Sequence, residues 1–132
     1  MDVAGGTRTR ARVLVVDDNK QICSLIRIML GRRGYDVTDV CDGPAAIASA
    51  SDDFDVILLD LGLPGMNGLE VCRRLRGEPE TASLPIVMLT GRAHPEDVRD
   101  GLRAGASEFL VKPFLEAELL AAIQRVSRSR LP

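Results

Sequence analysis

Three short apolar runs, uninterrupted by polar residues, constrain the fold of this 132-residue chain more than any other feature. They cover residues 13–16, 56–59 and 85–89. Runs of this length are typical of strands that are covered on both faces, as in a parallel sheet. A segment with apolar residues at helical spacing follows each run, so that strand and helix alternate along the chain. The sequence therefore predicts an α/β domain built on a parallel sheet.

Two further strands and five helices complete the predicted pattern. The strand at 35–40 is interrupted by Asp36 and Asp39, so we expect it at an edge of the sheet, and the last strand covers 108–111. The predicted helices lie at 22–30, with Gly34 as the stop signal, and at 43–50, 69–75, 95–105 and 115–126. Strand and helix thus alternate five times, which predicts a single five-stranded sheet with helices between its strands.

Length and composition fit one globular domain, with 45% hydrophobic and 27% charged residues, and leave no room for a second folded output domain. We expect a disordered tail at 1–11, the domain at 12–128 and a frayed end at 129–132. The net charge of −2 gives no indication of direct nucleic-acid binding or of an anionic membrane surface. No apolar run approaches the roughly 18 residues of a membrane span, and the start lacks the apolar core of a signal peptide. These observations predict a soluble cytoplasmic protein.

Cysteine, histidine and arginine residues give no separate site. The three cysteines (Cys23, Cys41, Cys72) lack metal-ligand spacing and are predicted to be small buried side chains. His94, the single histidine, precedes a helix in a Pro-containing loop, and we expect it on the surface. The arginines of the third helix (Arg73, Arg74, Arg76) have no aromatic residues between them and are predicted to form a solvated face, with Arg74 paired to Glu70.

Polar side chains of related chemistry end four of the five predicted strands. They are Asp17 with Asp18, then Asp60, Thr90 and Lys112. The carboxyl ends of parallel strands meet at one rim, so these side chains should converge. Three carboxylates and one ammonium leave an excess of negative charge, and oxygen-only ligands favour Mg²⁺ or Mn²⁺. A site neutralised in this way can accept a phosphoryl group, with the Thr90 hydroxyl and the Lys112 ammonium facing its oxygens.

These strand ends, together with Pro64, Gly68 and Pro113, resemble the motif set of the receiver domains of two-component response regulators, over residues 13 to about 126. The resemblance implies a flavodoxin-like, doubly wound sheet in the order 2-1-3-4-5 with helices on both faces. It also implies that Asp60 is the phosphoacceptor, which takes its phosphoryl group from a histidine kinase or a phosphotransfer protein, and that Thr90 and Lys112 hold the phosphoryl oxygens.

The same resemblance implies a metal-ligand set. Asp18, Asp60 and the backbone carbonyl of Gly62 would bind Mg²⁺, and Asp17 would act largely through a bound water. Gly62 and Arg92 occupy the two positions that flank the water that hydrolyses the acyl phosphate. Such a domain is a signalling phosphoacceptor with self-catalysed phosphorylation and dephosphorylation, and not an enzyme acting on an external substrate.

The resemblance further implies a switch and an output surface. Phe109 occupies the switch-aromatic position and, with Thr90, would couple the site to a face formed by the fourth helix (about 95–104), the fifth strand and the closing helix. A downstream protein or a second copy of the chain would bind there, with no direct nucleic-acid contact and no membrane. The Lys112–Pro113 bond is expected to be cis.

Two other classes of function compete with this interpretation. A small phosphohydrolase of the haloacid dehalogenase type also uses a strand-end Asp, Mg²⁺, a Ser or Thr and a Lys. That family places its nucleophile on the first strand with a second Asp two residues later, whereas Asp17 is followed by Asp18 and Asn19, and the chain has no cap domain. The third possibility is an interaction domain that works without phosphorylation, and the complete acidic set argues against it.

Overall fold

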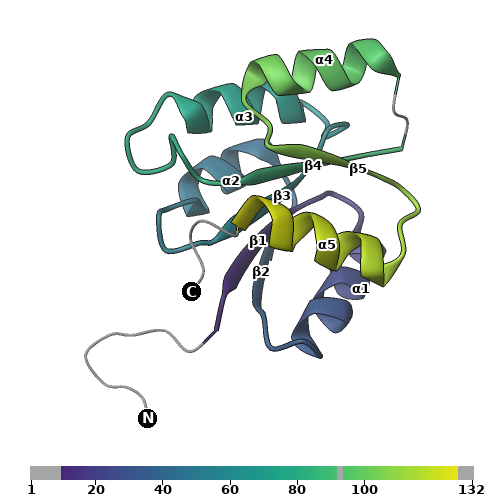
Figure 1. Ribbon diagram of the computed structural model, residues 1–132. Coiled ribbons are helices and arrows are strands. Elements are labelled where there is room, and N and C mark those ends of the chain that lie inside the picture. The colour runs from purple at the N-terminus through teal and green to yellow at the C-terminus, as the bar shows by residue number, and fades with distance from the viewer. Residues whose placement is uncertain (1–9, 92–93, 128–132) are drawn as a thin grey trace.

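The computed structural model describes residues 10–91 and 94–127, and these form a single layer of parallel strands between two layers of helices (Figure 1). The predictions for 1–9, for Arg92 and for 129–132 lie outside the described residues. The strand order is β2-β1-β3-β4-β5, and every pairing is parallel. The predicted doubly wound, five-stranded fold is therefore confirmed.

The elements follow the predicted alternation closely. The strands are β1 (Arg12–Val16), β2 (Asp36–Val40), β3 (Val56–Asp60), β4 (Ile86–Thr90) and β5 (Glu108–Val111). The helices are α1 (Lys20–Gly31), α2 (Gly43–Ser49), α3 (Gly68–Arg76), α4 (Pro95–Ala104) and α5 (Glu116–Ser127). The bounds lie within two residues of the predicted ones. The predicted stop signal differs, because α1 ends at Gly31, and Gly34 instead adopts a left-handed backbone (φ 88°) in the turn that leads to β2.

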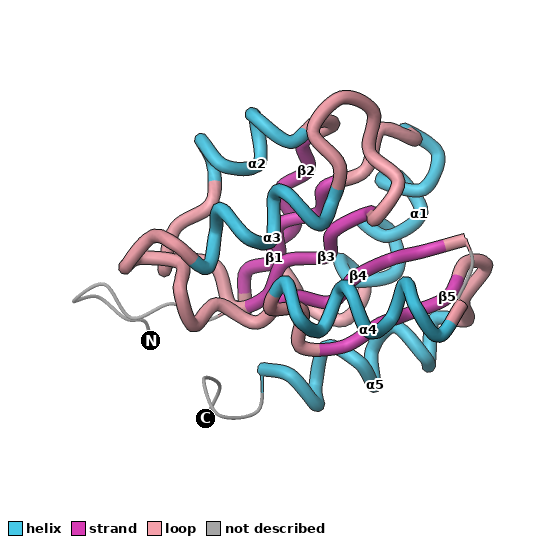
Figure 2. The backbone as a smooth tube through the Cα atoms, turned by 90° about the horizontal axis from the view of Figure 1, so that it is seen from above, coloured by secondary structure: helices cyan, strands magenta, loops and turns pink. Residues whose placement is uncertain are grey.

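The sheet separates two apolar clusters. Helices α1 and α5 cover one face, and α2, α3 and α4 cover the other, as the view from above shows (Figure 2). Along β3, Ile57 and Leu59 belong to the cluster under α2 and α3, whereas Val56 and Leu58 belong to the cluster under α1 and α5. Every residue of β3 and β4 is buried, which is why these strands have no alternation of polar residues.

Strand β2 forms one edge of the sheet, as its interrupted sequence predicts. Asp36 is exposed and lies 3.9 Å from the Arg12 guanidinium of the neighbouring strand. Asp39 is also exposed and accepts a hydrogen bond from Arg27 of α1. Asp36 and Asp39 are therefore both ion-paired at the edge of the sheet. A buried central strand would carry no such charged residues.

Two of the three cysteines are buried as predicted. The Sγ of Cys23 donates to the carbonyl of Asp17, and that of Cys72 donates to the carbonyl of Ala104, each at 3.3 Å. Burial raises the pKa of both thiols. The prediction for Cys41 was wrong, because Cys41 directly follows the edge strand β2 and is exposed.

The polar face of α3 is only partly solvated. Arg73 and Arg74 are exposed, and Arg74 forms the predicted ion pair with Glu70 at 2.9 Å. Arg76 does not fit the prediction, because it is half-buried and its guanidinium donates to the carbonyls of Gly105 (3.0 Å) and Thr81 (3.1 Å). It joins the end of α3 to the end of α4.

Two smaller predictions can be compared directly with the structure. His94 is exposed at the start of α4, as predicted. Across the described part of the chain, none of the helices has the length and apolar character that a membrane crossing requires.

Candidate functional site

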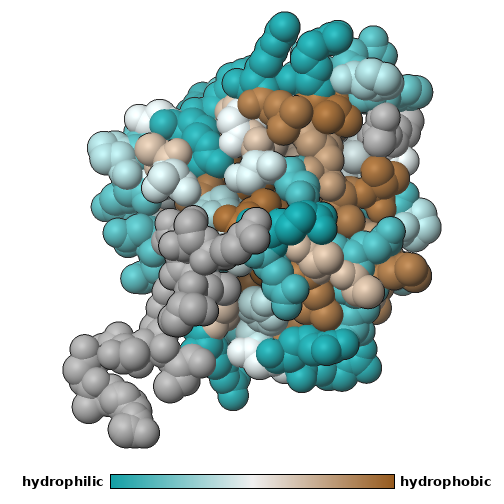
Figure 3. Space-filling view, in the orientation of Figure 1, coloured by the Kyte–Doolittle hydropathy of each residue, from teal (hydrophilic) through white to brown (hydrophobic). Residues whose placement is uncertain are grey.

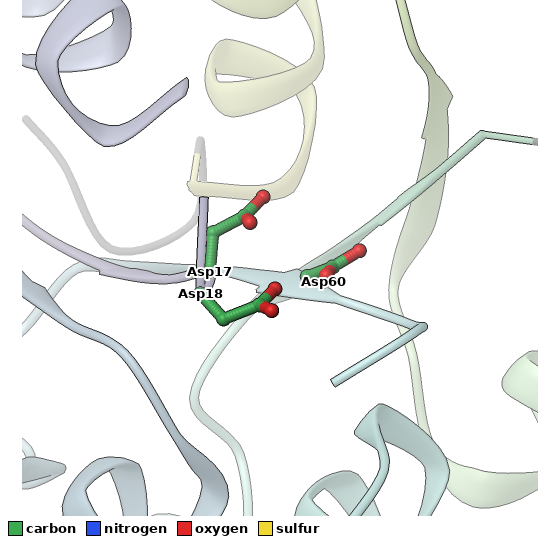
Figure 4. A group of neighbouring side chains, drawn as sticks. All are labelled: Asp17, Asp18 and Asp60. Atoms are coloured by element: carbon green, nitrogen blue, oxygen red, sulfur yellow. The ribbon is translucent and has the colours of Figure 1, made fainter. Parts of the chain in front are cut away.

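Three carboxylates meet at the carboxyl rim of the sheet (Figure 4). Asp17 directly follows β1 and Asp60 is the last residue of β3; because β1 and β3 are paired in parallel, with Val16 opposite Leu59, the two strand ends lie side by side. Oxygens of Asp17, Asp18 and Asp60 all lie within 4.8 Å of one another. Asp17 and Asp60 are 1% and 7% exposed, whereas Asp18 is open to solvent. The predicted convergence of these three residues is therefore observed.

Lys112 brings the ammonium group to this cluster from the end of β5. Its Nζ donates to Asp17 Oδ2 at 2.8 Å and to Asp60 Oδ1 at 3.3 Å. Its backbone N–H donates to the carbonyl of Thr90 at 2.7 Å, which fixes the end of β5 against the end of β4. The Lys112–Pro113 bond is cis, as predicted.

Asp17 is held by contacts that the sequence analysis did not identify. Its Oδ1 accepts from the N–H of Asn19 at 2.9 Å, and its backbone N–H donates to the carbonyl of Val40 at 3.2 Å. Cys23 donates to its carbonyl. Asn19 also caps α1, with its side chain accepting from the N–H groups of the first turn. An Asn just before a predicted helix is a recognisable N-cap signal, whereas nothing in the sequence indicates the role of Cys23.

The charges at the rim are only partly compensated. Burial raises the pKa of Asp60, and the negative charge of Asp17 raises it further, against the opposing effects of Lys112 and of the Gly62 N–H, which donates to Asp60 Oδ1 at 3.3 Å. Burial lowers the pKa of Lys112, but its hydrogen bond to Asp17 and the charge of Asp60 outweigh this, so the pKa is raised overall. A single ammonium therefore faces three carboxylates.

The donor set suits a hard divalent cation. Within the described residues this is the one cluster of three or more His, Cys, Asp or Glu side chains with the spacing to hold a metal ion, and all of its donors are carboxylate oxygens. Such donors favour Mg²⁺ or Mn²⁺ over softer ions. Gly62 lies beside the cluster, held there by its N–H to Asp60. That its carbonyl completes the ligand set stays a prediction.

Gly68 shapes the loop beneath Asp60. Its N–H donates to the carbonyl of Leu61 at 3.1 Å. A Cβ on Gly68 would lie 2.5 Å from the carbonyl oxygen of Asp60 and 2.8 Å from the Cα of Leu61. These are backbone atoms of the segment that carries the carboxylate, so the close approach requires glycine at this position.

Thr90 and Phe109 lie on the same face of the sheet. Met88 is paired with Phe109 in the β4–β5 register, and Thr90 is two residues beyond Met88 on the same strand. Because side chains alternate along a strand, Thr90 and Phe109 point to the side covered by α4. Thr90 is 5% exposed, and a Cβ on the following Gly91 would meet nothing within 4 Å. The structure thus brings the two predicted switch residues onto one side of neighbouring strands.

The fold and the site define a flavodoxin-like α/β domain with an acidic cluster and a lysine at the carboxyl rim of its sheet. The family model of the response regulator receiver domain, which describes the sequences of that family, matches residues 13–124 of this chain. The chain belongs to the family of response regulator receiver domains. The alternative of a haloacid dehalogenase-type hydrolase finds no support in these comparisons, because the matching family and the relatives described below are response regulators or receiver domains.

Curated relatives share this domain as part of longer proteins. The response regulator PleD of Caulobacter vibrioides is 41% identical over 122 residues, which are 92% of this chain and 27% of PleD. The DNA-binding response regulator MtrA of Mycobacterium tuberculosis is 41% identical over 116 residues, which are 87% of this chain and 50% of MtrA. The chain therefore spans half or less of the length of these relatives.

Two solved structures match over nearly their whole length. The chemotaxis protein CheY4 of Vibrio cholerae superimposes with a TM-score of 0.84 at 38% identity, covering 89% of this chain and 99% of CheY4. The receiver domain of the sensor histidine kinase PA1611 from Pseudomonas aeruginosa PAO1 gives a TM-score of 0.83 at 36% identity. The match covers 91% of this chain and 99% of the PA1611 chain. In that structure a magnesium ion is coordinated in the active-site cleft.

Proposed function

We propose that Asp60 accepts a phosphoryl group from the phosphohistidine of a histidine kinase, or from a phosphotransfer protein, in a Mg²⁺-dependent reaction. The observation that carries the proposal is the convergence of Asp17, Asp18 and Asp60 with the Lys112 ammonium at one rim of the sheet. We also propose that the domain, taken as residues 12–128, lies in the cytoplasm together with this phosphodonor.

Asp60 is the best placed of the three carboxylates to act as the nucleophile. Both oxygens of Asp17 are engaged, Oδ1 by the Asn19 N–H and Oδ2 by Lys112, and Asp17 is 1% exposed. In Asp60, Oδ1 accepts from Lys112 and from Gly62, whereas no hydrogen bond within the described residues reaches Oδ2. Among the described residues, attack by this oxygen on an incoming phosphorus atom therefore requires no hydrogen bond to be broken first.

The transfer forms a bond between Asp60 Oδ2 and phosphorus and breaks the bond from phosphorus to the histidine nitrogen of the donor. The Lys112 ammonium, held beside Asp60 by Asp17, and the Thr90 hydroxyl would receive the phosphoryl oxygens. A bound Mg²⁺, held by Asp18, Asp60 and the Gly62 carbonyl, with Asp17 acting through water, would neutralise the negative charge of the carboxylates and the phosphoryl group. Hydrolysis of the acyl phosphate by water, catalysed by the same site, would end the signal.

The output would pass through the face formed by α4, β5 and α5. Three large apolar side chains are exposed at or beside these elements, Leu102, Val111 and Leu115, and they are 51%, 43% and 69% exposed. In the space-filling view, hydrophobic residues gather among hydrophilic ones between α4 at the top and α5 in front (Figure 3). We propose that a downstream protein or a second copy of the chain binds this face.

Phosphorylation by a small acyl or amido phosphate tests the proposal without knowledge of the kinase. The protein should gain one phosphoryl group in the presence of Mg²⁺, and mass mapping should place it on Asp60. Asp60→Asn should abolish this labelling, whereas Asp53→Asn, a change at an exposed carboxylate on the opposite rim, should retain it. Undiminished labelling of Asp60→Asn would refute the assignment. Turnover of a generic phosphomonoester would instead indicate a hydrolase.

A further inference from the structure

The ring of Phe109 lies end-on against Gly101 of α4. A Cβ on Gly101 would lie 2.2 Å from Cζ, 2.7 Å from Cε1 and 3.3 Å from Cε2 of that ring. Two of these distances are far below any van der Waals contact between carbon atoms. The ring in its present position and any side chain at position 101 therefore exclude each other.

If a side chain were introduced at position 101, the Phe109 ring would be displaced and α4 would keep its position. The C-terminal end of α4 is fixed by Ala104, which is buried in the core, and by Gly105, whose carbonyl accepts from the half-buried Arg76 at 3.0 Å. The ring, by contrast, is the far end of one side chain on the edge strand β5, and Phe109 is only half-buried. Rotation about its side-chain bonds takes the ring out towards solvent without disturbing either element.

We propose that Gly101 is a positioning residue for the Phe109 ring: the space left by its missing side chain admits the ring between α4 and β5. This inference rests on the proposed function, together with the coupling of Asp60 to the output face through Thr90 and Phe109 that the family resemblance implies. Glycine is unfavourable inside a helix, and Gly101 lies within α4. Its presence there is explained by the ring that occupies the space.

The direct test is the position of the ring in Gly101→Ala, observed by NMR. In the unmodified protein we expect nuclear Overhauser effects between the Phe109 ring and the Gly101 α-protons. In Gly101→Ala these should be lost, and relaxation of the ring protons by a soluble paramagnetic agent should rise several-fold. The unmodified protein is also titrated with Mg²⁺ and beryllofluoride, which mimics the phosphoryl group on Asp60, to establish whether the site binds the mimic. A ring that keeps its place, in contact with the methyl group that the substitution adds, would overturn the inference.

Thermal unfolding supplies a second test, because the proposal predicts whether Gly101→Ala raises or lowers Tm. Gly101→Ala should lower Tm, but in a Phe109→Ala background it should raise Tm, because only the better helix preference of alanine then remains. Gly31→Ala is the matched control, since Gly31 lies at the end of α1 and an added Cβ meets nothing within 4 Å. It should raise Tm in both backgrounds and leave the ring in place. A rise in Tm for Gly101→Ala alone would contradict the inference.

The two proposals fail in distinguishable ways. If beryllofluoride does not bind at Asp60 in the unmodified protein, the proposed function fails, whatever the ring does. If it binds and the ring of Gly101→Ala behaves as in the unmodified protein, only the role of Gly101 is refuted. Binding of the mimic together with a displaced ring supports both.

Discussion

Lys112 lies closer to Asp17 than to Asp60: its ammonium is 2.8 Å from Asp17 Oδ2 and 3.3 Å from Asp60 Oδ1. The nearer partner is thus the almost fully buried carboxylate, and not the proposed phosphoacceptor. Asp17 holds the lysine in place by a charge-assisted hydrogen bond, while the longer contact leaves the lysine able to turn towards oxygens carried by Asp60. The stability of the metal-free rim should therefore depend on the pair formed by Lys112 and Asp17.

Lys112→Met should lower the free energy of unfolding of the metal-free protein by roughly 3 kcal/mol, because it leaves Asp17 buried without its ammonium partner. Saturating Mg²⁺ should restore most of this loss by supplying positive charge. Since the pKa of Lys112 is raised in the folded state, the stabilisation is present below the unfolded pKa and is lost as the pH rises through the folded value. Denaturant unfolding with and without Mg²⁺ measures the effect. Lys20→Met, at an exposed position, is the control; an equal loss with and without Mg²⁺ in Lys112→Met would contradict the prediction.

Asp60→Asn should stabilise the metal-free protein at neutral pH by a few degrees in Tm. Burial and Asp17 raise the pKa of Asp60, so its ionised form is disfavoured in the folded state. The folded state then binds more protons than the unfolded state, and stability falls as the pH rises from the unfolded to the folded pKa. The gain from Asp60→Asn should therefore be present above the folded pKa and disappear below the unfolded value. Thermal unfolding across this range, without divalent ions, checks it; a gain that does not change with pH would be inconsistent with this cause.

Asp18→Ala should weaken Mg²⁺ binding by at least about tenfold, which is about 1.4 kcal/mol. Asp18 is the exposed member of the cluster, so the substitution removes a metal ligand with little effect on the core. The chain contains no tryptophan, so calorimetry or amide NMR shifts are the suitable measurements. Glu80→Ala removes one exposed carboxylate from the loop before β4 and should leave the affinity unchanged. Equal affinities in the two variants would count against Asp18 as a ligand.

Thr90→Ala should uncouple the phosphoryl mimic from the output face. Thr90 and Phe109 point to the same side of neighbouring strands, so a Thr90 hydroxyl drawn towards Asp60 makes room for the ring behind it. Amide shifts of α4 and α5 with and without beryllofluoride should change strongly in the unmodified protein and in a Thr38→Ala control on the far edge strand. They should change little in Thr90→Ala. Equal responses in all three proteins would show that Thr90 does not transmit the signal.

Gly68→Ala should destabilise the domain by about 1–3 kcal/mol, the usual cost of overpacking, because the new methyl group meets the backbone of Asp60 and Leu61. It should also slow phosphorylation by displacing the carboxylate. The control for stability is Gly62→Ala, in which the added methyl group meets nothing within 4 Å. Denaturant unfolding and the rate of labelling by a small phosphodonor are the measurements. Unchanged stability in Gly68→Ala would mean that the loop adapts without strain.

The sheet and the acidic rim were predictable because their signals are local. Each central strand is an unbroken apolar run, and Asp60 directly follows one in the chain, so that parallel pairing alone brings the strand ends together. The edge position of β2 was equally readable from Asp36 and Asp39.

The features that the sequence did not reveal depend on contacts between distant segments. Arg76 is half-buried because Gly105, 29 residues later, ends α4 beside it. Cys41 is exposed because it follows an edge strand, although its residue type is usually buried. The contact of Gly101 with Phe109 likewise requires α4 and β5 to be in place. A residue pattern describes a single segment of the chain. Each of these three features depends instead on how two segments are placed relative to each other.

The charged edge strand β2 has a consequence for how the molecule behaves at high concentration. A parallel sheet that ends in an open strand offers unpaired backbone groups to any neighbouring molecule. On β2, Asp36 and Asp39 already pair with Arg12 and Arg27 of the same chain, so an intruding strand would have to separate these ion pairs and cover their charges. The edge thus acts as a barrier to fibre-like growth of the sheet from one molecule into the next.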